Sequence, residues 1–390
     1  MSSPFSLVEI LESRRLLSVG YTPAQIRTAY GFDQITFDNG TVQGNGAGQT
    51  IAVIEVDNDT TLNTDLDNFD AAYGLSNSGA GWSLSVIGQG GGAPPTSNTV
   101  GVESYETALD VEWAHAIAPA ANILVVEANS SDNDDLNAAA SYAATVKGVS
   151  AVSMSYTSVD SGLEGDLFYT TPANHSGVTF VAAAGDSAEV YHPASAATVL
   201  GVGGTSLTLG SGNTYLSETT WSGTGGGTSA YQAEPAYQYN VQDTGLRMTP
   251  DVAYDADPNT GFDIYVNGVD SPFVVGGTSA GAPQWAALIA IADQGRVLNG
   301  LGSLDGATQT LPMLYDLYGT PLYASAFHDI TTGGNGVFFA GPGYDEVTGL
   351  GSPQANVLVQ YLAGNISLPE PATFAIALAL TPLLLRRPRR

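Results

Sequence analysis

The sequence predicts an α/β fold in which a parallel β-sheet is covered by helices. Short apolar runs rich in β-branched residues recur along the chain, and segments with helical periodicity lie between several of them. Continuous apolar runs indicate strands buried on both faces, and their alternation with helices indicates crossover connections. The chain of 390 residues shows no repeat of fixed period, and its length suits one large domain or two ordinary ones.

Each predicted element follows from its local pattern. Buried strands are expected where β-branched runs are bounded by Gly, Asn or Asp, and helices where apolar residues recur every three to four positions. The stretch 202–278 is rich in Gly, Thr and Tyr and indicates further strands and turns. The predicted strands are residues 50–56, 122–126, 149–154 and 178–183, and the predicted helices are residues 103–117 and 135–146.

The charge balance shows depletion of basic residues. There are 38 acidic residues and only 10 Lys and Arg, six of which lie near the two ends. A protein with few bases avoids strong positive self-repulsion when its carboxylates are neutralised at low pH. The composition therefore fits a protein that works in acid, and it also fits a secreted protein of arbitrary low isoelectric point. It excludes nucleic acid as a partner, because no basic patch is present, and the absence of cysteine excludes thiol chemistry.

Ser279 is the candidate nucleophile. It lies in Gly-Gly-Thr-Ser-Ala-Gly-Ala-Pro at residues 276–283, after an extended run and immediately before the apolar helix expected over residues 285–292. A glycine-flanked turn at the start of a helix presents a hydroxyl beside backbone N–H groups, which suits a nucleophile. The same pattern is also an ordinary helix N-cap.

A carboxylate pair is the better candidate for the base that a serine needs. Glu106 and Asp110 are four residues apart on a predicted helix, and their shared face continues through apolar residues. Two carboxyl groups in an apolar setting share a proton, so the pair can accept and return one. The alternative is a solvated acidic turn. Glu103 and Glu112 lie outside this face of the helix and are expected to face solvent.

The histidines do not supply a base by their sequence context. His175 and His192 lie in turn-like surroundings and are expected to be surface or packing residues, and His328 is expected to support a loop.

Two further acidic sites follow strand ends or glycine-rich loops. Asp186 comes directly after the strand expected over 178–183, where ligands bind in open α/β sheets. If it keeps its proton it can donate a hydrogen bond to a developing oxyanion, and the alternative is a helix N-cap or turn residue. Near the end, Asp329 is followed by a Gly-rich segment that ends at Asp345. Two carboxylates with backbone carbonyls suit a hard cation such as calcium, and the alternative is a plain loop.

Together these segments resemble the sedolisin, or serine-carboxyl peptidase, family. The resemblance runs in family order over roughly residues 21–362. It implies a subtilisin-like parallel sheet with helices on both faces, in a single catalytic domain over residues 21–364. It also implies peptide-bond cleavage at acidic pH through an acyl-enzyme. The matching segments are residues 21–31, 106–110, 184–186, 250–258 and 276–279, and 329–330 together with 341–345.

The resemblance also implies residue roles. Ser279 would be the nucleophile, Glu106 its general base, and Asp110 the partner that orients Glu106 and shares its proton. Asp186 would be the acid that stabilises the oxyanion, and Glu55 an acid that extends the carboxylate chain. One structural Ca²⁺ would be held by Asp329, Asp345 and the carbonyl groups of Ile330, Gly341 and Gly343.

Some positions depart from the family pattern. The family usually carries a large N-terminal prodomain, whereas about twenty residues precede Tyr21 here. Gly281 stands where a second serine is common, and Tyr156 stands where some members have a tryptophan. These differences concern folding and the substrate pockets more than the four candidate catalytic side chains.

The two ends indicate export. Residues 1–20 resemble a short N-terminal motif of some exported bacterial proteins. Residues 365–390 contain Pro-Glu-Pro, an apolar segment and an arginine cluster, which resembles the PEP-CTERM sorting signal. The apolar segment is short for a bilayer span, and a frayed apolar tail is the alternative. The resemblance implies export, transient membrane association and removal of the tail.

The expected function is that of a secreted, acid-acting endopeptidase that takes protein or peptide substrates and is a monomer. A different class remains possible, in which the scaffold is a non-catalytic binding protein of a surface or matrix. A third class, an α/β-hydrolase esterase, would need Gly-x-Ser-x-Gly with a later histidine, and His328 does follow Ser279.

Overall fold

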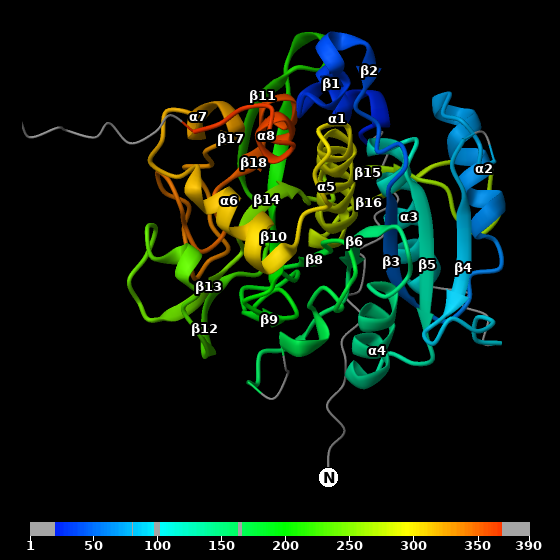
Figure 1. Ribbon diagram of the computed structural model, residues 1–390, viewed down its shortest axis with the longest axis horizontal. Coiled ribbons are helices and arrows are strands. Elements are labelled where there is room, and N and C mark those ends of the chain that lie inside the picture. The colour runs from blue at the N-terminus through cyan, green and yellow to red at the C-terminus, as the bar shows by residue number, and fades with distance from the viewer. Residues whose placement is uncertain (1–19, 80, 97–101, 163–165, 369–390) are drawn as a thin grey trace, which may run out of the picture.

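The computed structural model describes residues 20–79, 81–96, 102–162 and 166–368 (Figure 1). An eight-stranded sheet forms its centre in the order β11-β10-β8-β6-β3-β5-β4, with β14 beside β10. Its neighbours pair in parallel except β10 and β11. The strands are β3 (Thr50–Val56), β4 (Leu84–Gly88), β5 (Asn122–Ala128), β6 (Val149–Met154), β8 (Thr179–Ala183), β10 (Val199–Leu209), β11 (Tyr215–Thr220) and β14 (Val252–Asp255).

The sheet is buried on both faces because its strands carry apolar residues at the positions that point to each face. In β3, Ile51 and Val53 point into one apolar cluster, while Ala52 and Ile54 point into another on the opposite face. The buried, mostly parallel sheet predicted from the sequence is therefore confirmed. The helices are α1 (Pro23–Ala29), α2 (Leu62–Tyr73), α3 (Val102–Ile117), α4 (Asn133–Ala143), α5 (Gly281–Leu298), α6 (Leu311–Asp316), α7 (Tyr323–Ala326) and α8 (Ala355–Leu362).

Helices α3 and α5 cover one face of the sheet, and α4 lies on the other (Figure 1). Residues 281–296 of α5 are all buried. A helix that is apolar on every side belongs inside the protein, so the core holds α5 and the Thr278–Ala280 turn that leads into it.

Short strand pairs surround this core. The pairs are β1 (Thr36–Phe37) with β2 (Val42–Gln43), β7 (Ser158–Val159) with β9 (Tyr191–His192), β12 (Gly227–Ala233) with β13 (Leu246–Thr249), β15 (Phe262–Ile264) with β16 (Phe273–Val275), and β17 (Phe327–His328) with β18 (Ser352–Pro353).

None of the helices in the described ranges is long and apolar enough to cross a membrane.

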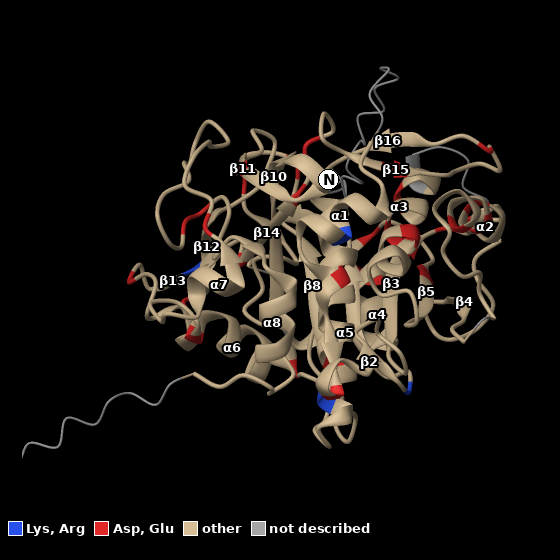
Figure 2. Ribbon diagram, turned by 90° about the horizontal axis from the view of Figure 1, so that it is seen from above, with Lys and Arg blue, Asp and Glu red and all other residues tan. Residues whose placement is uncertain are grey.

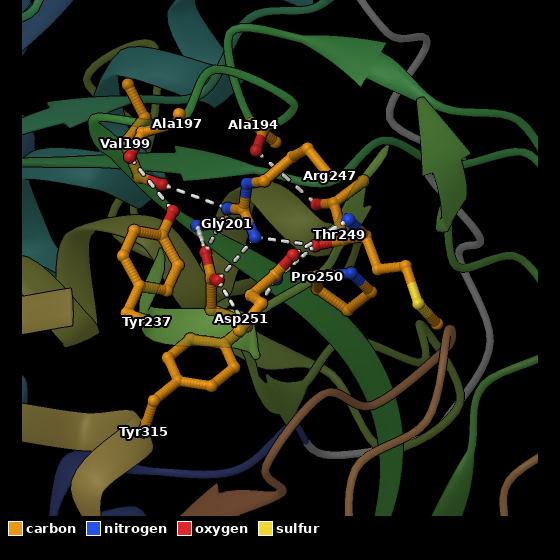
Figure 3. Close-up of polar contacts among 12 residues, drawn as sticks. Ala194, Ala197, Val199, Gly201, Tyr237, Arg247, Thr249, Pro250, Asp251 and Tyr315 are labelled. Atoms are coloured by element: carbon orange, nitrogen blue, oxygen red, sulfur yellow. Dashed lines mark hydrogen bonds and ion pairs between the residues drawn. The ribbon is translucent and has the colours of Figure 1, made fainter. Parts of the chain in front are cut away.

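Two of the few basic residues in the body of the chain, Arg247 and Arg296, are buried. Figure 2 marks the Lys and Arg positions along the ribbon. Arg247 is fully buried, and its Nη1 and Nη2 lie 2.7 and 2.6 Å from the two carboxylate oxygens of Asp251 (Figure 3). Tyr315 donates to the same carboxylate at 2.6 Å, and Gly201 N–H at 2.7 Å. A bidentate pair whose carboxylate accepts further hydrogen bonds can hold buried charge. It fixes the β13–β14 connection against β10 and α6.

Candidate active site

Ser279 lies on a tight turn between a short strand and the buried helix. The turn η6 (Thr278–Ala280) follows β16 and leads into α5, and Ser279 is 1% exposed. Gly277 precedes the turn with φ of 127°, a region that favours glycine. A Cβ on Gly277 would lie 2.5 Å from Asp186 Oδ2. The glycine therefore lets the serine turn approach the acid that follows β8.

Helix α3 brings the carboxylate pair to this turn. Glu106 is 8% exposed and Asp110 is fully buried. The Ser279 side chain is near enough to Glu106 to lower the pKa of that carboxyl. Ser155, at the end of β6, places its Oγ 2.8 Å from Asp110 Oδ2 and 3.3 Å from the carbonyl oxygen of Ser279. One hydroxyl thus lies against both the carboxylate pair and the nucleophile's backbone.

Burial dominates the electrostatics of the pair. It raises the pKa of Glu106 well above its ordinary value, and the charge of Asp110 raises it further, while the neighbouring Ser279 side chain lowers it. Burial likewise raises the pKa of Asp110 to about 8, against a lowering by the Ser155 hydroxyl. Two such groups do not both ionise in this setting. The arrangement can hold one shared proton next to the serine.

Glu55 extends this group of carboxyls from β3. Its pKa is raised well above the ordinary value by burial first and then by the charges of Asp110 and Glu106. Thr107, on α3, donates to Glu55 Oε2 at 3.3 Å. The sequence placed Glu55 at the end of a strand, and the structure brings it to the same apolar space as the pair.

Asp186 lies on the other side of the serine turn. Thr278 donates to Asp186 Oδ1 twice, from its backbone N–H at 2.7 Å and from its hydroxyl at 2.9 Å. The charge of Asp186 also acts on Glu106. The structure therefore brings together all four side chains that the sequence singled out, namely Ser279, Glu106, Asp110 and Asp186.

Sequence reasoning missed two contributors and misplaced one residue. Ser155 and Thr278 were not singled out, although each lies next to a predicted strand end or motif serine. The expectation that Glu112 faces solvent was wrong. Glu112 is fully buried and accepts a hydrogen bond from Tyr265 N–H at 3.0 Å. Helix α3 is covered on this side too, so a single apolar stripe does not describe it. The side chain of Glu103 lies outside the described residues.

Each of the four histidines is engaged away from the serine. His115 lies 3.2 Å from Asp70 and stacks on Trp82, and His175 contacts the carbonyl oxygens of Ser176 and Val146. His192 is 2% exposed and lies 3.1 Å from the Tyr169 hydroxyl, so it is a packing residue. His328 stacks on Tyr215 with ring centroids 3.5 Å apart. The imidazole base expected of an esterase is thus not supplied by His328.

In the predicted calcium loop, both carboxylates accept hydrogen bonds from backbone N–H groups of the glycine-rich segment. Gly343 N–H donates to both oxygens of Asp329 at 3.0 Å, and Gly341 N–H donates to Asp345 Oδ2 at 3.1 Å. Both carboxylate charges act on Tyr323. Within the described ranges no group of three or more His, Cys, Asp or Glu side chains is placed to hold a metal ion. Two carboxylates and loop carbonyls are a donor set of hard oxygens that fits calcium.

Comparison with known proteins decides the family. A model of the subtilase family matches residues 96–298, just over half of the chain. The chain belongs to the subtilase family. The similar proteins include sedolisin and kumamolisin, which supports the resemblance that the motifs indicated.

Two curated relatives and one solved structure show the likeness. Kumamolisin from Bacillus sp. (strain MN-32) is 35% identical over 396 residues, which cover 92% of this chain and 66% of kumamolisin. Sedolisin from Pseudomonas sp. (strain 101) is 34% identical over 200 residues, 46% of this chain and 32% of that protein. The structure of Pseudomonas sedolisin, a serine-carboxyl proteinase complexed with two molecules of pseudo-iodotyrostatin, has a TM-score of 0.74 and 26% identity. It covers 90% of this chain and 100% of that one.

These matches indicate a serine-type peptidase. The chain spans slightly less than two thirds of the length of kumamolisin and smaller shares of the other curated relatives.

Proposed function

We propose that residues 21–364 form a serine-carboxyl endopeptidase that hydrolyses peptide bonds of protein substrates in acid. One observation carries the proposal. Ser155 Oγ lies 2.8 Å from Asp110 Oδ2 and 3.3 Å from the carbonyl oxygen of Ser279, so the turn of the nucleophile lies against the buried carboxyl pair. A serine next to a proton-sharing carboxyl pair can act as a nucleophile without an imidazole.

The first half of the reaction forms an acyl-enzyme. The Ser279 oxygen attacks the scissile carbonyl carbon and gives its proton to Glu106, and the carbonyl π electrons move to the oxygen. Protonated Asp186 donates a hydrogen bond to that oxyanion, and Thr278 holds the Asp186 carboxyl in place. Glu106 then passes its proton to the leaving nitrogen as the C–N bond breaks.

Water completes the reaction by the reverse path. Glu106 takes a proton from the attacking water, and the C–O bond to Ser279 breaks as that proton returns to the serine oxygen. Throughout, Asp110 holds the proton that keeps Glu106 oriented, and Ser155 fixes Asp110 against the backbone of Ser279. Acidic conditions favour this cycle because Asp186 must be protonated to donate.

The remaining expectations form part of the same proposal. Asp329, Asp345 and the carbonyl groups of Ile330, Gly341 and Gly343 would hold one Ca²⁺, which would stiffen the loop. That loop is tied to the buried core because Tyr344 donates to the carbonyl oxygen of Pro250 at 3.1 Å (Pro250 is shown in Figure 3). Export, a monomeric state and transient membrane association through the tail are proposed from the sequence, and residues 369–390 of that tail lie outside the described residues.

A casein assay across pH tests the proposal. The wild type is expected to hydrolyse denatured casein in acid, and Ser279→Ala is expected to remove hydrolysis. Ser153→Ala is the matched control, because Ser153 is also a fully buried serine and its Oγ has no hydrogen-bond partner. Wild-type turnover by Ser279→Ala would refute the serine mechanism. Binding of casein without hydrolysis by the wild type would favour the non-catalytic scaffold.

A further inference from the structure

A fifth acidic side chain stands next to Glu55 in the sheet. Glu127, on β5, is the register partner of Glu55 on β3. Residues in register on parallel strands point to the same face. That face is the one on which Ile51 and Val53 of β3 contact α3 and α5. Glu127 therefore lies one strand further from the serine than Glu55, on the side that faces the catalytic carboxyls.

Both side chains are buried among other acids. Glu127 is 1% exposed and Glu55 is 5% exposed. One oxygen of each, Glu127 Oε2 and Glu55 Oε1, is buried without a hydrogen-bond partner. A buried carboxylate oxygen of this kind is costly if charged, and a proton on the group removes that cost.

Among the described residues, the charged groups that act on this pair are carboxylates. Glu106 and Asp110 act on Glu55 from α3. Asp59 and Asp57, from the segment after β3, act on Glu127, which also accepts the backbone N–H of Asp59. On the far side, β4 places Gly88 in register with Glu127, so no side chain faces it from there. Glu127 thus closes one end of a row that runs from Glu106 through Asp110 and Glu55.

We propose that Glu127 is a positioning residue that acts through Glu55 to keep the shared proton on the Glu106–Asp110 pair as the pH rises, and so sets the upper pH limit of hydrolysis. The inference rests on the proposed peptidase function. When Glu127 ionises, its charge disfavours ionisation of Glu55 and, next in the row, of the catalytic pair. The catalytic pair therefore retains its proton to a higher pH than it would beside an apolar or amide side chain.

The direction of the pKa shifts agrees with this geometry. Burial first, and then the charges of Asp59 and Asp57, raise the pKa of Glu127 to about 8. Glu127 is accordingly neutral in acid and becomes charged in the range where the catalytic pair begins to lose its proton. Its effect should be confined to the alkaline side of the pH profile.

The test is the pH profile of kcat/KM for Glu127→Gln. We expect unchanged activity in acid and an alkaline limb that moves down by about one pH unit, which is roughly a tenfold loss of kcat/KM on that limb. General structural damage would instead lower activity at every pH. The matched control is Glu112→Gln, a buried glutamate of α3 whose charge interactions are with Asp65, Asp70 and Asp59. It should leave the limb in place. An unmoved limb in Glu127→Gln would overturn the proposal.

A second measurement reads the protons without hydrolysis. The infrared carbonyl band of protonated carboxyl groups can be followed against pH in Ser279→Ala, with and without Glu127→Gln. Glu127→Gln removes one carboxyl group from the band. The band of the remaining carboxyl groups should then disappear at a lower pH than in Ser279→Ala alone, and disappearance at the same pH would overturn the proposal. Glu127→Leu serves if Glu127→Gln does not fold. A wild type without hydrolysis would refute the proposed function alone, because the infrared titration still decides the role of Glu127.

Discussion

Replacing Asp110 should change how the stability of the protein depends on pH. Burial raises the pKa of Asp110 from 3.8 to about 8. Below about pH 4 the group is protonated in both states and its stabilising effect is fully present. Between about pH 4 and 8 the folded state holds a proton that the unfolded state has lost, so stability falls as the pH rises through this window.

The size of the effect follows from the shift. One proton corresponds to about 1.4 kcal/mol of unfolding free energy per pH unit, and the shift of roughly four units gives on the order of 5 kcal/mol over the window. Because Asp110 shares its proton with Glu106, this is an upper value for the single group. Asp110→Asn removes the ionisation. The unfolding free energy should therefore fall less steeply with pH, by about 1.4 kcal/mol per pH unit, which corresponds to one proton.

Urea unfolding at several pH values between 4 and 8 measures this slope. Both proteins should carry Ser279→Ala, which prevents self-digestion during the experiment. Asp134→Asn is the control, because Asp134 is exposed near the start of α4 and should leave the slope unchanged. Equal slopes in Asp110→Asn and its parent would refute the assignment of a proton to this buried group.

Three further outcomes are expected. Asp186→Ala should lower kcat by about 10²–10³-fold with little change in KM, as measured on a peptide substrate, and an unchanged kcat would exclude the oxyanion role. Gly277→Ala should reduce kcat more than it reduces the melting temperature, because the added Cβ would lie 2.5 Å from Asp186 Oδ2; equal kcat would contradict that close approach. Arg247→Met should lower the unfolding free energy by about 3–5 kcal/mol, since it leaves buried Asp251 unpaired, and a smaller loss in urea unfolding would show that the pair is dispensable.

The parallel strands could be predicted because a strand that is buried on both faces has a continuous run of apolar residues. The run at residues 50–56 became β3 with the same bounds. The sequence also predicted the carboxylate pair, because Glu106 and Asp110 obey helical spacing. Local spacing of this kind predicts which side chains share a face of one helix. In the structure, both side chains lie on the face of α3 that meets the serine turn.

Contacts between distant elements could not be predicted in this way. Glu112 lies on α3 opposite the pair and looked like a solvated residue, yet Tyr265 from beyond β15 covers it. Glu127 lies in an apolar strand. Its position next to Glu55 depends on the register of β5 beside β3, which the sequence does not show. Ser155 gains its place only when β6 ends beneath α3 and α5. Each of these needs the packing of segments that are far apart in the chain.

Detection of a covalent intermediate on Ser279 tests the central claim most directly. An activated ester of a short peptide, mixed with the enzyme in acid and quenched within milliseconds, should leave the acyl group on the enzyme. Mass spectrometry of the digested protein should then locate it on Ser279, and Glu106→Gln should form it much more slowly. An acyl group on another residue, or full turnover by an enzyme in which Ser279 stays unmodified, would contradict the account.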